Sequence, residues 1–250
     1  MDQTKKQEFA LVKKLNNKRI CDLEKSLKDL LQKSFPKVSE QETIQSDICN
    51  RYSKPDIYIK VGKEIRYISL KSGRSDSMHF ENIKTFILFL RELGVSKETQ
   101  RTILYFHYGD STLDGTGIKR YSFEELFPLI SKRLKMANLE LMQKGIIEAA
   151  LKRFVFVGTE DRKIQVDEIW YGDNNYYLSI TKRELTDFVL SKTFKHINTL
   201  HIGPMTIQPY LRDVNRKSRN QFKRQTIQVK WHYLLTDIEK IIAKRVSWFL

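Results

Sequence analysis

The fold is decided by one stretch of the sequence, Pro55-Asp56-Ile57-Tyr58-Ile59-Lys60-Val61-Gly62-Lys63-Glu64-Ile65-Arg66-Tyr67-Ile68-Ser69-Leu70-Lys71. Two runs rich in β-branched and aromatic residues flank Gly62-Lys63. A two-residue loop with glycine first is typical of a type II′ turn, so the stretch predicts a β-hairpin. In that hairpin, residues whose numbers add up to 125 lie opposite one another.

Three polar side chains meet at the open end of the predicted hairpin. The register places Asp56 opposite Ser69, and Lys71 is then the diagonal neighbour of Asp56. Opposed side chains lie roughly 5 Å apart at Cβ, and diagonal ones about 7–8 Å apart. Two interpretations are open. The three groups form either a solvated sheet face, on which Lys71 prevents edge-to-edge pairing with another chain, or a site suited to phosphate chemistry.

The segments around the hairpin predict a mixed α/β fold. Apolar residues recur with helical spacing between residues 8 and 33, and residues 38–50 read as a polar loop or short helix. Ser77 is a candidate cap for a helix that ends near Leu93 and carries Glu81 in its first turn. Further strands are predicted at 101–108, 154–157, 166–170, 176–180 and 226–231, and further helices at 122–153, 181–189 and 236–246.

Composition indicates a globular protein with an anionic partner. The chain has 250 residues, of which 40% are hydrophobic, enough to bury a sizeable core. Lys and Arg number 45 against 30 Asp and Glu, a net charge of +15. Such a charge favours a polyanion, nucleic acid first, although a lysine-rich surface without specific meaning is the alternative.

The sequence also predicts where the protein is located and the redox state of its cysteines. The first residues lack an apolar segment, and the longest apolar run, 86–90, is too short to span a bilayer. We therefore expect a cytoplasmic protein with no membrane partner. Cys21 and Cys49 lack any paired spacing, which predicts reduced thiols.

The densest positive charge lies in the basic segment, residues 212–230. It holds seven Lys and Arg side chains against one Asp, a net charge of +6. The candidate DNA-binding residues are Arg212, Arg216, Lys217, Arg219, Lys223 and Arg224. Amide side chains that suit the reading of base edges are interleaved with them: Asn215, Asn220, Gln221, Gln225 and Gln228. Six phosphate contacts would give log affinity a slope of about −5 against log salt.

Pro55-Asp56, followed at the end of the second strand by Ser69-Leu70-Lys71, resembles the PD-(D/E)xK signature of the restriction-endonuclease-like nuclease superfamily. Residues 8–110 are similar to its αβββαβ core. Ser69 stands where the signature has an acid. In a Ser-x-Lys variant of the superfamily, a glutamate on the next helix supplies the missing carboxylate, and Glu81 is the candidate here.

The resemblance implies catalytic roles for Asp56, Ser69, Lys71 and Glu81. Asp56, Glu81 and the Leu70 carbonyl would bind Mg²⁺, which activates water and neutralises charge during phosphodiester hydrolysis. Lys71 would orient the attacking water and stabilise negative charge. Ser69 would be a hydrogen-bonding spacer.

The sequence thus predicts an α/β protein with a restriction-endonuclease-like core, a mixed central sheet flanked by helices, and a β-rich, basic C-terminal subdomain. Residues 1–150 would form the nuclease-like core and residues 151–250 a DNA-binding subdomain continuous with it. The predicted function is that of a Mg²⁺-dependent endonuclease of double-stranded DNA, of the type II restriction kind, and the resemblance implies a homodimer. The alternatives are a catalytically inactive DNA-binding protein of the same fold and an RNA-binding or RNA-processing protein.

Overall fold

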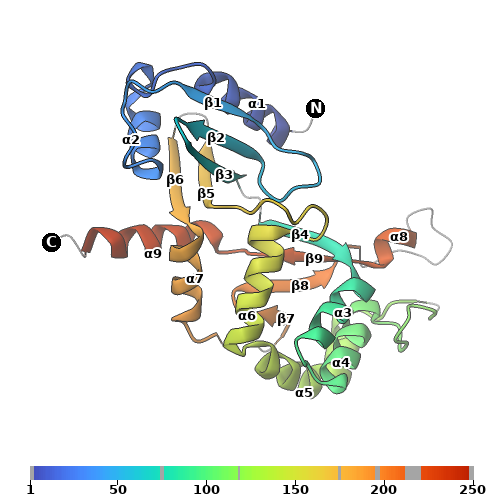
Figure 1. Cartoon of the computed structure of the whole chain (residues 1–250). Helices are drawn as coiled ribbons and strands as arrows, with labels where there is room; N and C mark the ends of the chain where they lie inside the picture. Colours follow the sequence, from blue (N-terminus) through green and yellow to red (C-terminus); the bar gives the residue numbers. More distant parts are fainter. Residues whose placement is uncertain are drawn as a thin grey trace. The chain divides into compact units, whose positions relative to one another are not determined.

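The structure is a computed structural model that describes residues 3–73, 76–117, 119–173, 176–194, 198–211 and 221–247. The chain forms two compact units, each made of segments far apart in the sequence. Unit 1 comprises Met1–Ser75, Lys152–Phe188 and Tyr233–Leu250, and unit 2 comprises Asp76–Leu151 and Val189–His232. The positions of the two units relative to one another are not determined (Figure 1).

Unit 1 is built on a mixed five-stranded sheet in the order β1-β2-β3-β5-β6. The strands are β1 (Ile44–Ile48), β2 (Ile57–Val61), β3 (Glu64–Lys71), β5 (Glu168–Asp173) and β6 (Tyr176–Thr181). Neighbouring strands are antiparallel except β3 and β5, which are parallel. The helices of this unit are α1 (Gln3–Leu15), the 3₁₀ turn η1 (Ile20–Asp22), α2 (Lys25–Ser34), the π-helical η2 (Lys152–Val157), α7 (Lys182–Leu190) and α9 (Leu234–Ser247).

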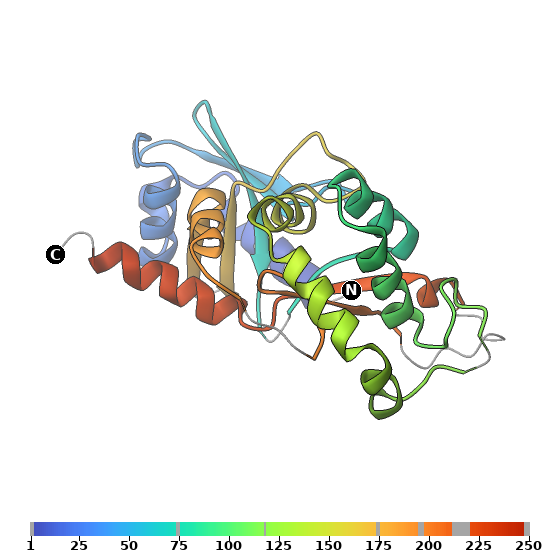
Figure 2. The same ribbon diagram turned by 90° about the horizontal axis from the view of Figure 1, so that it is seen from below.

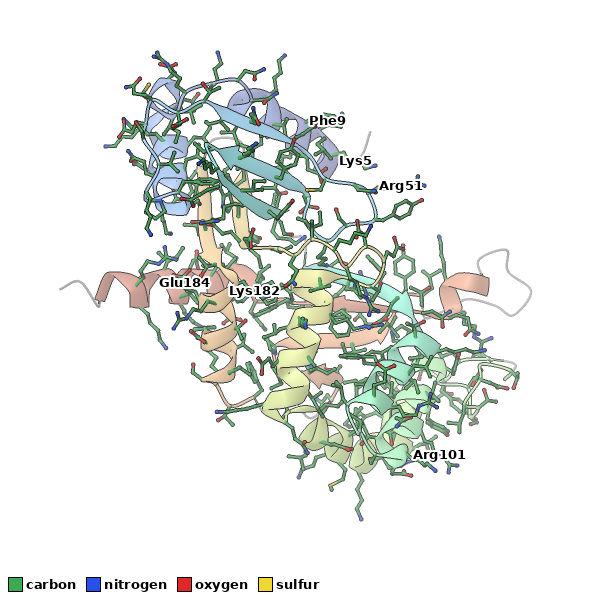
Figure 3. All side chains as sticks on the ribbon, viewed as in Figure 1. Lys5, Phe9, Arg51, Arg101, Lys182 and Glu184 are labelled. Atoms are coloured by element: carbon green, nitrogen blue, oxygen red, sulfur yellow. The ribbon has the colours of Figure 1, made fainter. Side chains whose placement is uncertain are left out.

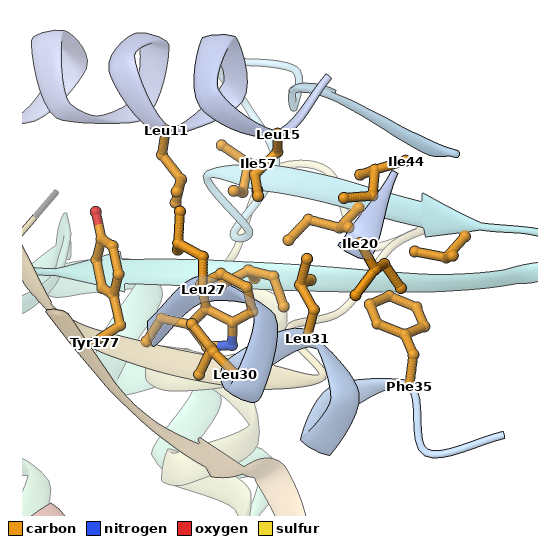
Figure 4. Close-up of a cluster of buried hydrophobic side chains, with 14 of the residues drawn as sticks. Leu11, Leu15, Ile20, Leu27, Leu30, Leu31, Phe35, Ile44, Ile57 and Tyr177 are labelled. Carbon is orange, nitrogen blue, oxygen red and sulfur yellow. The ribbon is translucent and has the colours of Figure 1, made fainter. Parts of the chain in front are cut away.

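Alternation along the strands gives the mixed sheet one apolar face. Ile57, Ile59 and Val61 of β2 are buried, whereas the residues between them are half-buried. Leucines of α1 and α2 pack against this face, and Figure 4 shows their side chains reaching toward the strands. Both α2 and α9 contact β6, as Figure 2 shows from below. The core of unit 1 therefore fixes one face of the hairpin and leaves the other for polar side chains.

Unit 2 contains an antiparallel four-stranded sheet in the order β4-β9-β8-β7. The strands are β4 (Ser77–Asn82), β7 (Leu200–Ile202), β8 (Met205–Pro209) and β9 (Thr226–Lys230). Its helices are α3 (Ile83–Glu92), α4 (Lys97–Tyr108), α5 (Phe123–Leu141), α6 (Lys144–Leu151) and the short α8 (Gln221–Arg224).

The α/β class predicted from the sequence is confirmed, with a mixed five-stranded sheet and an antiparallel sheet, both flanked by helices. The predicted helical start and three-stranded antiparallel meander are present, but residues 77–108 then form β4, α3 and α4, so the αβββαβ order is not completed within residues 8–110, and the strand parallel to β3 comes later in the chain. That parallel strand is β5, which lies far beyond residues 8–110. The two units do not coincide with a boundary at residue 150, and separate functions for residues 1–150 and 151–250 remain a prediction.

The strand predicted at 101–108 is wrong, because these residues form α4. Ser96 caps this helix by accepting a hydrogen bond from the Thr99 N–H (3.2 Å), and Gly109 ends it with a φ of 57°. The buried residues Thr99, Thr102, Ile103 and Phe106 follow helical spacing. The β-branched and aromatic content of the segment therefore reflects a buried helix face, because tertiary packing overrides local β-propensity.

The prediction that a helix starts at Ser77 is also wrong, because the helix starts at Ile83. Residues 77–82 form β4, which pairs with β9, and Asn82 caps α3 by accepting from the Lys84 N–H (2.8 Å). Glu81 is therefore a strand residue. Three smaller predictions also fail, since residues 8–33 form two helices separated near Asn17 (φ 61°), residues 44–48 form a strand, and residues 154–157 are π-helical.

Within the described ranges, no helix combines the length and apolar character needed to cross a membrane.

Candidate active site

The hairpin register brings Asp56 and Ser69 together. Tyr58 pairs with Tyr67 and Ile57 with Ile68, so the predicted sum of 125 is confirmed. Gly62 has a φ of 58°, as the first position of a type II′ turn requires. The Ser69 hydroxyl donates to Asp56 Oδ2 (3.1 Å), and the Leu70 N–H donates to the same oxygen (2.6 Å). These two donors fix the carboxylate at the end of the hairpin.

Lys71 lies at the end of β3, two residues beyond Ser69 and hence on the same face of the sheet. It is half-buried and pairs with Tyr171 of β5. The loop that follows is held on both sides, because the Tyr171 hydroxyl donates to the Gly73 carbonyl and Ser72 Oγ donates to Gln7 of α1 (2.6 Å). The backbone at Lys71 is therefore fixed by its pairing with β5 and by the hydrogen bonds of the two residues that follow it.

Lys54 is a site residue that the sequence reasoning missed. Its aliphatic stem covers Gly158, where an added Cβ would lie 3.5 Å from Lys54 Cβ. Burial and the neighbouring Lys71 ammonium lower the pKa of Lys54 to about 7, and the Asp56 carboxylate opposes that shift. Lys54 belongs to the loop between β1 and β2, which also carries Arg51, labelled in Figure 3. The site thus combines the Asp56 carboxylate and Lys71 with a Lys54 amine that is only partly protonated at neutral pH.

The thiol near the site is unsuited to nucleophilic attack. Both cysteines are free, as predicted. Burial and then the Asp56 carboxylate raise the pKa of Cys49 to about 12, so this thiol is protonated at neutral pH.

Asp56 retains one carboxylate oxygen for a cation. In the part of the chain that the structure describes, the hydrogen bonds to its side chain all reach Oδ2. Over the same residues no group of three or more His, Cys, Asp and Glu side chains is placed to hold a metal. Mg²⁺ commonly keeps several waters and uses only one or two carboxylates together with substrate phosphates. Oδ1 of Asp56 fits such a site as a single protein carboxylate.

Glu81 belongs to unit 2, whereas Asp56, Ser69 and Lys71 belong to unit 1. Its side chain is buried, and its Oε1 is 4.0 Å from Nε2 of His79, two residues earlier on β4. Strand alternation turns Glu81 to the covered face of its sheet, while Phe80 beside it is exposed. The pairing of Glu81 with Asp56 remains a prediction.

The basic segment is described only at its C-terminal end. Arg212, Arg216, Lys217 and Arg219 lie outside the described residues. Lys223 Nζ is 6.0 Å from the centre of the Tyr210 ring. Arg224 forms an ion pair with the fully buried Asp110 carboxylate. This contact favours a structural role for Arg224 and leaves Lys223 as a described candidate for phosphate binding.

Sequence comparisons do not place the chain in a family. No family model matches it, and no curated protein matches it at a significant level. Among solved structures, it is similar to the restriction endonuclease MspI in complex with its cognate DNA. The TM-score is 0.43 at 13% sequence identity, over 82% of this chain and 77% of that chain.

Proposed function

We propose that the protein is a Mg²⁺-dependent endonuclease of double-stranded DNA, of the type II restriction kind. The observation that carries the proposal is the fixed Asp56 carboxylate on the hairpin face that also bears Ser69 and Lys71. Two donors on the opposite strand hold Oδ2 of Asp56, and Oδ1 is left available for a cation. A polar sheet face that only contacts solvent has no need of a carboxylate fixed in this way. This is the geometry expected of a metal ligand.

Asp56 and the Leu70 carbonyl would hold the metal in unit 1, and Glu81 is the proposed second carboxylate. Bound Mg²⁺ supplies a Lewis acid that activates water and neutralises charge on the phosphate. Ser69 donates to Asp56 and so orients it without adding negative charge where a phosphate must approach. The proposal for Glu81 rests on the Ser-x-Lys pattern of the sequence.

The lysines would act on the phosphate and on the water. Lys71 orients the attacking water and stabilises the negative charge that develops on the phosphoryl oxygens. Lys54, packed over Gly158 with its pKa lowered to about 7, would add an amine that is partly neutral near pH 7 and could exchange a proton with water or phosphate. The basic segment would bind the DNA backbone, with Lys223 as its described member. A homodimer would supply the two sites that double-strand cleavage requires.

The second candidate is a DNA-binding protein of the same fold that does not cleave. Two observations favour it: Ser69 occupies the expected acid position, and over the described residues no group of three or more His, Cys, Asp and Glu side chains is placed to hold a metal. Both candidates predict binding to duplex DNA, and only the first predicts hydrolysis.

Cleavage of supercoiled plasmid DNA by the purified chain separates the two candidates. We expect nicked and linear products with Mg²⁺ and none with EDTA. Asp56→Ala and Lys71→Ala should abolish cleavage and retain DNA binding. Lys60→Ala is the matched control, because Lys60 is another half-buried lysine of the same hairpin, away from its open end. Cleavage that survives both site substitutions would overturn the assignment, and binding without cleavage by the wild type would favour the second candidate.

A further inference from the structure

One face of the sheet in unit 2 carries rows of polar and aromatic side chains across three strands. Phe80 of β4 pairs with Gln228 of β9, which pairs with Gln208 of β8. In the next row Asn82 pairs with Thr226, and the Tyr210 N–H donates to the Thr226 carbonyl (2.9 Å). Since directly paired residues share a face, these side chains form one surface, which we call the amide face.

The amide face is open, whereas the opposite face is packed. Ile227 and Val229 of β9 are buried, and Ile207 of β8 is buried with them. On the amide face Phe80 is 45% exposed and Tyr210 is 38% exposed, while the two glutamines are half-buried. One packed and one solvated face is common in antiparallel sheets, so the feature that sets this face apart is the pair of exposed aromatic rings beside the amides.

The two glutamines fix one another's orientation. Gln208 Nε2 donates to Gln228 Oε1 (3.1 Å), and Gln228 Nε2 donates to Ser77 Oγ (3.4 Å). Each Nε2 carries two protons. Over the described residues, Gln208 therefore retains its carbonyl oxygen and a second N–H, an acceptor and a donor on one amide. That pair of groups matches the N6–H and N7 edge of adenine in the major groove.

Aromatic and basic groups border the glutamine pair. The Phe80 and Tyr210 rings contact edge to face, with centres 4.9 Å apart, and Lys223 Nζ lies over the Tyr210 ring. The strands β8 and β9 are joined by the chain that contains the basic segment. Duplex DNA lying on this face would thus meet amides on the strands and, on their connection, the described Lys223. The charge of that connection argues for duplex DNA as the occupant of the face.

We propose that Gln208 and Gln228 determine sequence specificity by contacting base edges of duplex DNA. The inference rests on the proposed DNA-directed function and adds to it the residues that read the sequence. β8 and β9 are the two central strands of the four-stranded sheet, and β-sheets as well as two-stranded ribbons read the grooves of DNA. The competing role is a structural one, in which the glutamines only brace neighbouring strands.

The test is a selection of binding sites from a randomised duplex library, carried out in EDTA so that cleavage plays no part. The wild type, the double variant Gln208→Met/Gln228→Met and the control Gln45→Met are compared, because Gln45 is an exposed strand glutamine on β1. Methionine keeps the length of the side chain and removes the amide. Thermal unfolding of all three proteins confirms that they fold.

We expect the double variant to lose roughly 5- to 150-fold discrimination at one or two positions of the selected site, the range for a bidentate amide contact. Its affinity for unrelated duplexes and the salt dependence of that affinity should stay within about twofold of wild type, since phosphate contacts are retained. The control should select the wild-type site.

An unchanged site for the double variant would overturn the inference and leave the nuclease proposal intact, as would a wild type that binds duplex DNA without preference. Tighter binding to single strands than to duplexes would also overturn it, because that result would make Phe80 and Tyr210 a stacking platform. A wild type that binds no DNA would overturn both proposals.

Discussion

The two sheets of the molecule assemble their polar surfaces in different ways. The polar end of the hairpin in unit 1 comes from residues 56–71, joined by one two-residue turn. The amide face of unit 2 takes Phe80, Gln208 and Gln228 from three strands separated by long stretches of chain. The first surface is set by local geometry and the second by the packing of the whole unit.

This difference predicts how each surface responds to substitution. In the hairpin, the register follows from the turn, so a change at the turn disturbs the site directly. In unit 2, buried polar contacts hold the strand connections. Asp110 is the main example, because its carboxylate pairs with Arg224 and also accepts hydrogen bonds from Thr112 and Gly117.

The largest effect on stability is expected for Asp110→Ala in unit 2. The substitution leaves the Arg224 guanidinium poorly compensated in a largely buried position, which typically costs about 3–5 kcal/mol. Urea denaturation measures the loss. The matched control is Asp187→Ala, which removes an exposed partner of Arg183 and should change stability little.

A loss below about 1 kcal/mol for Asp110→Ala would contradict the structural role of this pair. In that case Arg224 would return as a candidate phosphate ligand. Addition of Arg224→Met to the Asp110→Ala variant should recover part of the lost stability, because no unpaired charge then remains.

A smaller effect is expected at the hairpin turn. Gly62→Ala places a side chain at a φ of 58° and should destabilise the protein by about 1 kcal/mol or more, although there is space for the added methyl group. Gly145→Ala is the control, since Gly145 lies in α6 with open space around it and should gain up to about 1 kcal/mol. Equal effects at both positions would show that the turn does not set the register.

The smallest effect concerns the pH dependence of unit 1. Burial raises the pKa of Glu168, which accepts hydrogen bonds from Ser34 (2.7 Å) and Trp170 (2.9 Å). A carboxyl group with a raised pKa in the folded state contributes stability while it is protonated and loses that contribution as pH rises. Between pH 4 and pH 7 the wild type should therefore lose stability relative to Glu168→Gln. The difference between the two free energies of unfolding should shift in favour of the variant as pH rises. The exposed Glu148→Gln should show no such trend, and a trend of opposite sign for Glu168→Gln would contradict the assignment.

The hairpin and its site were predictable because they depend on local rules. Gly62-Lys63 determines the register, and the register alone brings Asp56 to Ser69. Lys54 was missed because its lowered pKa comes from burial in the folded chain, including packing over Gly158, a hundred residues later. Lys54 precedes Pro55-Asp56 in a loop, where hydrophobic periodicity cannot show whether a side chain is buried.

The errors also have physical causes. Ser77 resembles a helix cap, but pairing with β9 extends this segment, and Asn82 caps the helix instead. Residues 101–108 contain strand-forming residues, while Ser96 and Gly109, which bound the helix, were the better signal. The amide face was beyond prediction, because no sequence rule pairs Gln208 with Gln228.

The most direct test of the central claim is the single-turnover rate of DNA cleavage with Mg²⁺ by the wild type and by Lys71→Met. Methionine keeps an unbranched apolar side chain at position 71 and removes the charge. We predict a fall of about 10²–10³-fold, the usual cost of losing one group that stabilises transition-state charge, with DNA affinity retained. A Lys71→Met rate within about tenfold of the wild type would contradict the claim that the hairpin is the catalytic centre.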